Sequence, residues 1–120
     1  MTAELFTVLP NFVLLKFWFK YDTITIKYFK NEPNNKESIS SNRIRYINED
    51  SKGNIWIGTS YGLNKFDKQS NKFYRYTEKD GLLNDNIYGI LIDDYENIWV
   101  STNYGISKFD VDKGVFSSFL

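Results

Sequence analysis

Two stretches of this sequence are close copies of each other: NIWIGTSYGLNKFD at residues 54–67 and NIWVSTNYGISKFD at residues 97–110. Their tryptophans, Trp56 and Trp99, are 43 positions apart, and every other matched pair keeps this offset without a gap. The offset also relates pairs outside the two stretches, namely Ile44 with Ile87, Ile47 with Ile90, Asp50 with Asp93, and Phe73 with Phe116. The chain therefore contains a repeat of a length that is typical of β-propeller blades and of some helical arrays.

The sequence of each copy predicts four short β-strands, and the 3.6-residue apolar period of a helical repeat is absent. In the first copy the predicted strands are residues 44–48, 55–59, 63–66 and 73–76. The segments between them are rich in Asp, Asn, Ser and Gly, which form tight turns. Gly62 and Gly105 are expected to supply a positive φ in a hairpin. The repeat unit is thus a four-stranded antiparallel meander.

The second strand of each copy is apolar without alternation, as Ile55-Trp56-Ile57 and Ile98-Trp99-Val100 show. An antiparallel strand with one wet face would alternate, so we expect both faces of these strands to be covered. Blades stacked around an axis provide such cover. The sequence therefore predicts an all-β fold, a partial β-propeller with about two complete four-stranded antiparallel blades plus a partial N-terminal blade.

A shorter and less regular copy precedes these two. Lys20-Tyr-Asp22 resembles Lys65-Phe-Asp67, and Lys27-Tyr-Phe29 resembles the outer strand that includes Phe73. The predicted organisation is an irregular apolar segment or remnant strands at residues 1–21, the outer part of a partial blade with an inter-blade loop at residues 22–42, and blades at residues 43–84 and 85–120.

Residues 5–19 are mostly apolar but are interrupted by Pro10 and Lys16, so the run is too short to span a bilayer. Glu4 precedes it and no small-residue cleavage pattern follows, so there is no clear signal peptide. Buried strands of an incomplete blade are the favoured interpretation. Membrane contact or export through residues 5–19 is the alternative.

The composition excludes several classes of function. Lys plus Arg and Asp plus Glu number 15 each, so no net field attracts nucleic acid. The chain contains no Cys and no His, which removes disulfides, thiolate metal sites and the commonest general base. Aromatic residues make up 18% of the chain, which favours strands. We expect no catalytic residue, no metal and no cofactor, and predict that the chain is not an enzyme.

The repeat resembles a known family at three runs: SNRI at residues 41–44, EDSKGNIWIGT at 49–59 and YGLNKFD at 61–67. These are similar to the two-component regulator propeller repeat, which forms the sensor region of bacterial hybrid histidine kinases and of some cyclic-dinucleotide signalling proteins. The resemblance covers residues 22–120. The second copy departs from the family pattern at Tyr95-Glu96, where Asp-Gly is preferred, and at Ser101, which replaces a glycine.

This resemblance implies a ligand-sensing propeller outside the cytoplasmic membrane, ahead of a membrane helix and a histidine kinase or other output domain. Polysaccharide fragments are ligands for part of the family. The localisation of this chain itself stays undetermined, because the resemblance implies an extracytoplasmic place whereas the sequence shows no clear signal peptide.

Ligands commonly dock on the propeller rim where hairpin turns and inter-blade loops meet. The candidate ligand-binding residues on that rim are Tyr61, Tyr104, Asn103, Arg43, Asn42, Asp85 and Asn86. The alternative is that they are exposed turn residues without a ligand. For Trp56 and Trp99 we expect packing between blades rather than sugar stacking. For Asp50 and Asp93 we expect turn capping rather than a calcium site.

The leading hypothesis is a non-catalytic propeller fragment that senses a small molecule or an oligosaccharide for a two-component-type receptor. One alternative is a structural unit whose blades pair with other blades, in cis or in trans, to complete a ring as a homo-oligomer. The other is a truncated, non-functional remnant of such a receptor.

Overall fold

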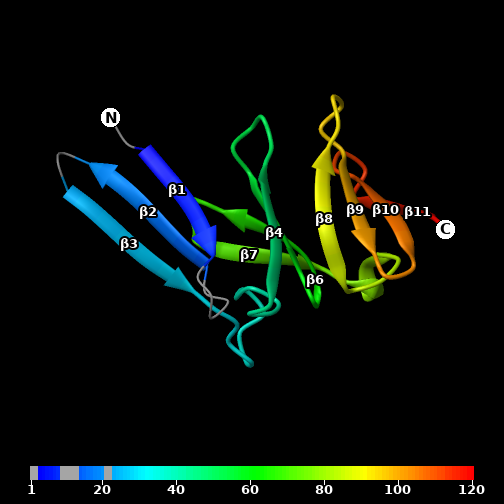
Figure 1. Ribbon diagram of the computed structural model, residues 1–120, viewed down its shortest axis with the longest axis horizontal. Helices are drawn as coiled ribbons and strands as arrows, with labels where there is room; N and C mark the ends of the chain where they lie inside the picture. Colours follow the sequence, from blue (N-terminus) through cyan, green and yellow to red (C-terminus); the bar gives the residue numbers. More distant parts are fainter. Residues whose placement is uncertain (1–2, 9–13, 21–22) are drawn as a thin grey trace.

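The computed structural model describes residues 3–8, 14–20 and 23–120, which form three antiparallel sheets in sequence order (Figure 1). The N-terminal blade contains β1 (Ala3–Val8), β2 (Leu14–Lys20) and β3 (Thr23–Phe29). The middle blade contains β4 (Ile44–Glu49), β5 (Ile55–Thr59), β6 (Gly62–Asp67) and β7 (Lys72–Tyr76). The C-terminal blade contains β8 (Ile87–Ile92), β9 (Ile98–Thr102), β10 (Gly105–Asp110) and β11 (Val115–Phe119).

The middle and C-terminal blades are simple meanders, each with its strands hydrogen-bonded in chain order. A short 3-10 turn, η1 (Glu78–Asp80), lies between them. The fold class is confirmed: a partial propeller with two four-stranded blades and a smaller N-terminal blade. In the part of the chain that the structure describes, no helix has the length and apolarity needed to cross a membrane.

The strands begin and end within one residue of the predicted positions because turn residues separate them. Gly62 closes the β5–β6 hairpin with a φ of 100°, and Gly105 closes the β9–β10 hairpin with a φ of 141°. A Cβ atom on Gly62 would lie 2.6 Å from the carbonyl oxygen of Tyr76, so the position requires glycine for space as well as for φ. Glu96 adopts a φ of 65° at the position where the middle blade has Gly53.

The range 1–21, expected to hold an irregular segment or remnant strands, contains β1 and β2. β2 pairs with β3 from Leu14↔Phe29 to Lys20↔Thr23, so the division expected at residue 21 falls inside one sheet. Tyr21 and Asp22, part of the motif compared above, lie outside the described residues, as do residues 9–13 of the apolar run.

The first core lies between the N-terminal and middle blades. Phe29, Phe66 and Phe73 are buried there, with ring centroids 4.8–5.5 Å apart. Phe6 of β1 packs edge-on against Phe66 at 5.6 Å. Ile44 and Ile47 of β4 point into the same cluster, whereas the other residues of β4 are partly or fully exposed, as expected for an innermost strand.

The second core lies between the middle and C-terminal blades and is built around Trp56, which is fully buried. Its ring lies 6.1 Å from both Tyr76 and Phe109. Gly58 permits close approach of the two sheets, because a Cβ atom there would lie 2.6 Å from Cγ2 of Ile87. The inner strands β4 and β8 consequently run side by side (Figure 1).

The prediction that both faces of the second strand are covered holds for β5, all of whose residues are buried, but is wrong for β9. Trp99 is only partly buried and Ser101 is exposed. The reason is that no described element of the chain packs on that side of the C-terminal blade. Trp99 instead stacks on Phe119 of its own sheet at 5.5 Å.

Candidate functional site

The carboxylates of Asp50 and Asp93, which the sequence singled out, accept hydrogen bonds from their own turns and from the strand that follows. Oδ2 of Asp50 accepts hydrogen bonds from Nε1 of Trp56 at 3.0 Å and Nδ2 of Asn54 at 2.9 Å, while Oδ1 accepts from the amides of Lys52 and Asn54. Asp93 repeats the arrangement, and its Oδ2 accepts from Nε1 of Trp99 at 2.9 Å. The expected turn-capping role is confirmed.

These hydrogen bonds set the charge state of both carboxyl groups. Burial raises the pKa of Asp50, but the hydrogen bonds from Trp56, Asn54 and Lys52 outweigh it and the net pKa is lowered. The pKa of Asp93 is lowered by the Trp99 indole first and then by backbone amides. Both groups are held as anions in their turns.

The opposite ends of the blades, at the bottom of Figure 1, form what we call the lower rim: the turns at residues 60–62 and 103–105 and the loops before β4 and β8. The middle-blade turn contacts both loops. The amide of Gly62 donates to the carbonyl of Asp85 at 2.6 Å, and the amide of Ser60 donates to the carbonyl of Arg43 at 3.1 Å. Backbone contacts therefore bring three segments distant in sequence to one place.

The side chains of two predicted site residues accept hydrogen bonds from backbone amides within these loops. Oδ1 of Asn42 accepts from the amide of Asn31 at 2.6 Å, and Oδ1 of Asp85 accepts from the amide of Glu78 at 2.8 Å. They shape the rim. Tyr61 and Tyr104 remain open to solvent at 51% and 70% exposure.

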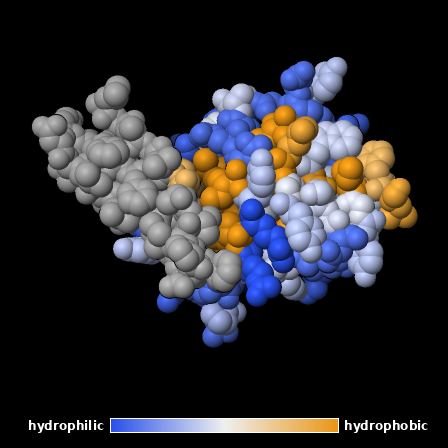
Figure 2. Space-filling model, in the orientation of Figure 1, coloured by the Kyte–Doolittle hydropathy of each residue, from blue (hydrophilic) through white to orange (hydrophobic). Residues whose placement is uncertain are grey.

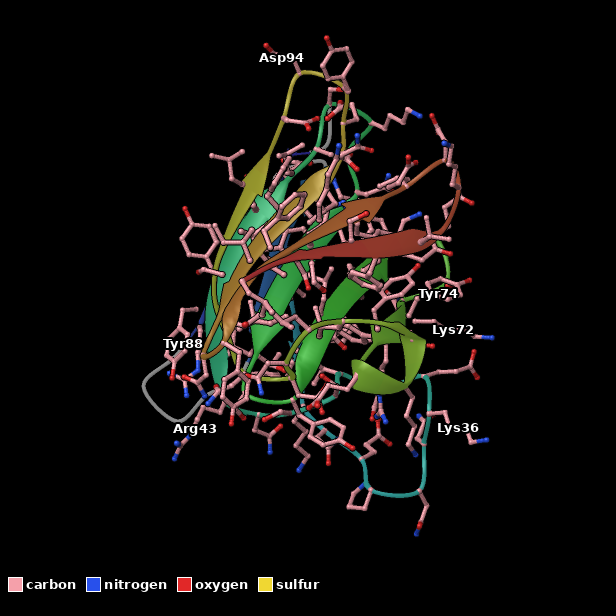
Figure 3. The ribbon with its side chains drawn as sticks, turned by 90° about the vertical axis from the view of Figure 1, so that its right-hand side faces the viewer. Lys36, Arg43, Lys72, Tyr74, Tyr88 and Asp94 are labelled. Carbon is pink, nitrogen blue, oxygen red and sulfur yellow. The ribbon has the colours of Figure 1, made fainter. Side chains whose placement is uncertain are left out.

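A polar cluster lies where the lower rim meets the inner strands. The guanidinium of Arg45 on β4 sits 4.6 Å from the ring centroid of Tyr88 on β8. The Tyr88 hydroxyl donates to Oδ1 of Asn103 at 2.8 Å. In Figure 3, Arg43 and Tyr88 both lie at the lower left of the view. We call Arg43, Arg45, Tyr88 and Asn103 the inner-rim cluster.

Two buried polar atoms in this part of the chain have no hydrogen-bond partner: Nε of Arg45, within the cluster, and Oδ1 of Asn86, two residues before Tyr88. Buried polar atoms are usually paired, so each is a feature that needs an explanation. Asn86 precedes β8 at the position that Arg43 holds before β4. Of the predicted residues, the structure brings Asn103 together with two that sequence reasoning missed, Tyr88 and Arg45, and Arg43 lies on the same side of the view in Figure 3.

A signal for the missed pair existed in the sequence. Arg45 and Tyr88 are the second residues of the two inner strands, at the repeat offset of 43 positions. They interrupt otherwise apolar runs, and strands that line a propeller channel are expected to carry such residues.

An apolar groove of about 410 Å³ lies on the C-terminal blade, next to Tyr46 of β4. Its lining includes Gly89, Leu91, Trp99 and Ile106. Gly89 stands where the middle blade has Tyr46, so this end of the C-terminal blade lacks the side chain that fills the same position in its neighbour. Among the described residues, no group of three or more acidic, His or Cys side chains is arranged to hold a metal.

Comparison with known families identifies the repeat. The model described as "Two component regulator propeller" matches residues 38–61 and 81–104, which span β4–β5 and β8–β9 with their preceding loops. The resemblance noted from the sequence is confirmed. No curated protein gives a significant match.

Three of the solved structures similar to this chain are domains of proteins from B. thetaiotaomicron. The extracellular domain of BT3049, described as a hybrid two component system, matches with a TM-score of 0.73 and 16% identity over 92% of this chain and 17% of that one. Two structures of the extracellular domain of BT4673, described as a one component and as a hybrid two component system, match with a TM-score of 0.52 and 18% identity. They cover 98% and 95% of this chain.

This chain spans only 17–24% of the length of those solved domains. At such identities the similarity establishes the fold.

Proposed function

We propose, on the premise that this chain carries two copies of the two component regulator propeller repeat, that it is a ligand-sensing, non-catalytic segment of a bacterial signalling receptor. The observation that carries the proposal is this repeat match, supported by the likeness to extracellular domains of proteins described as one and two component systems. The segment would act outside the cytoplasmic membrane, and a histidine kinase or other output domain would belong to the parent receptor.

The inner-rim cluster is the place where we propose that the ligand binds. The Tyr88 ring offers a flat surface for a sugar ring, while the Arg45 guanidinium and the Asn103 amide offer hydrogen bonds to hydroxyl or carboxylate groups. The unpaired Nε of Arg45 and Oδ1 of Asn86 add one buried donor and one buried acceptor. A small molecule or oligosaccharide with hydroxyl and carboxylate groups suits this set best. Tyr61 and Tyr104 would extend the surface along the lower rim.

The test is binding of neutral and uronic-acid-containing oligosaccharides, screened with the labelled chain and measured by titration calorimetry. We expect Tyr88→Ala and Arg45→Ala to weaken binding by about 10- to 100-fold, the equivalent of a lost stacking contact or charged hydrogen bond. Tyr74→Ala is the matched control, since Tyr74 is 52% exposed on β7 and lies on the opposite side of the view in Figure 3.

Loss of affinity in the control as large as in the inner-rim variants would contradict this site. The absence of any oligosaccharide binding by a cooperatively folded chain would contradict the sugar ligand. A chain that fails to fold cooperatively at all would favour the remnant hypothesis instead.

A further inference from the structure

The open face of the C-terminal blade is apolar. Leu91, Ile106 and Phe119 are 60%, 44% and 50% exposed, and Trp99 stacks on Phe119 between them. The C-terminal blade, which carries this face, lies at the right-hand end of Figure 1, the side turned toward the viewer in Figure 3, and orange surface is visible at that end in Figure 2. We call these four residues the Trp99 face.

The repeat itself shows what such a face binds. Its counterpart on the middle blade, 43 positions earlier, contains Trp56 and Leu63, both 0% exposed. They are buried because the C-terminal blade covers them with its other face, whose buried residues are Ile87, Ile90, Ile98, Val100 and Phe109. The partner that fits this surface is therefore the apolar face of another blade. The Trp99 face continues, one repeat later, an interface already present inside the chain.

We propose that the Trp99 face binds the N-terminal blade of a second copy of this chain, head to tail, and that two copies close a ring. The N-terminal blade lies at the far left of Figure 1 and packs against the middle blade on one side, through Phe6 and Phe29. No described element of the chain lies beyond it. Within the described residues, the first and the last sheet of each copy therefore each leave one face without a packing partner, and the two faces differ, as a head-to-tail contact requires.

The number of blades selects the dimer. Propellers typically contain about four to eight blades. The described residues of each copy form three sheets, so two copies give six, whereas three copies would give nine. A further blade supplied in cis by the same polypeptide is the competing occupant. The inference goes beyond the proposed function, because a ring of two copies can form whether or not a ligand binds.

The first experiment measures mass by light scattering and sedimentation equilibrium over a wide range of concentration. We expect a shift to about 28 kDa, twice the 14.2 kDa of one chain. Leu91→Lys and Ile106→Lys should each weaken the dimer at least 100-fold while leaving cooperative unfolding intact. Tyr95→Lys is the matched control: Tyr95 is 85% exposed in a turn away from the face, and it should change the dimer less than twofold. A monomer at all concentrations, or a trimer, would overturn the proposal.

The second experiment distinguishes a head-to-tail ring from two Trp99 faces that meet each other. The chain has no cysteine, so Ile106→Cys introduces a single thiol. In the ring the two thiols lie in separate interfaces, beyond the Cβ–Cβ distance of about 4 Å that a disulfide needs. Oxidation should then link copies no faster than in Tyr95→Cys. Rapid cross-linking of Ile106→Cys alone would overturn the head-to-tail arrangement.

Discussion

The middle and C-terminal blades share the repeat motif around their tryptophans and the same turn hydrogen bonds, yet they differ in burial. Thr59 and Thr102 make the same turn contacts, and Asp50 and Asp93 hold their tryptophans in the same way. Nevertheless Trp56 is fully buried and Trp99 is not. The repeat sequence therefore specifies the conformation of a blade, whereas the neighbouring blade determines how much that sequence contributes to stability.

The largest expected effect separates the two tryptophans. Trp56→Ala removes a side chain enclosed by Tyr76 and Phe109, and should lower the free energy of unfolding by about 3–5 kcal/mol. Trp99→Ala removes a partly exposed ring, and should cost about half as much or less. Both variants lose the same indole hydrogen bond, so the difference reports burial. Urea unfolding, at a concentration where light scattering gives a monomer, provides the measurement. Equal losses would show that the two faces are equally covered.

A second comparison concerns Gly58 and its counterpart Ser101. Gly58→Ser places the residue of the C-terminal blade into the middle blade, where its Cβ would lie 2.6 Å from Cγ2 of Ile87. Because the sheets must separate or Ile87 must shift, we expect a loss of about 1–3 kcal/mol in the free energy of unfolding. The reciprocal Ser101→Gly adds no clash on an exposed strand position and should change stability only through backbone entropy, by about 1 kcal/mol or less. Thermal unfolding of both variants tests this, and a Gly58→Ser as stable as the parent chain would refute the close approach.

The sequence predicted the blades well because local chemistry decides them. Asp, Asn and Gly fix the turns, and Ile55 to Ile57 required cover on both faces. The exposure of Trp99 could not be predicted, because Trp56 and Trp99 have near-identical neighbours in sequence and differ only in what packs on them. The repeat predicted that Tyr61, Arg43 and Asp85 share one rim. In the structure, the turn that contains Tyr61 forms backbone hydrogen bonds to Arg43 and to Asp85.

Arg45 and Tyr88 were missed for a related reason. Their contact crosses from one blade to the next, so it depends on the register between β4 and β8 rather than on either strand alone. The sequence of a single turn predicts which of its residues are exposed, but it does not predict which side chains of two adjacent blades contact each other. For the same reason, the sequence did not predict that Nε of Arg45 and Oδ1 of Asn86 are buried without a hydrogen-bond partner.

A pH titration tests whether both Asp–Trp turns rely on a charged carboxylate. The folded-state pKa values of Asp50 and Asp93 are lowered from 3.8. Each group thus stabilises the fold above its unfolded pKa, and this stability is lost as pH falls through the folded pKa. Asp50→Asn should cost about 1 kcal/mol at pH 7, after allowance for solvent screening, and less near pH 3. Asp93→Asn should shift stability in the same direction by a smaller amount. Urea midpoints between pH 2.5 and 7 measure both, and a pH-independent difference would exclude the charged hydrogen bonds as its cause.

The smallest expected effect concerns a surface pair that the C-terminal blade does not repeat. Nζ of Lys68 lies 3.1 Å from Oε2 of Glu49, whereas the positions 43 residues later hold Val111 and Ile92, which pack against the second core. Both members of the ion pair are exposed to solvent, 31% for Lys68 and 53% for Glu49, so water and salt weaken their attraction. Glu49→Gln should therefore lower the free energy of unfolding by no more than about 0.5 kcal/mol in dilute buffer and by nothing measurable near 1 M salt. Val111→Ala, which removes apolar contact from the equivalent place, should cost more and keep its cost in salt, because hydrophobic burial is not screened. If Glu49→Gln lowered the free energy of unfolding more than Val111→Ala does, the middle blade would depend on a surface ion pair in a way that the C-terminal blade does not.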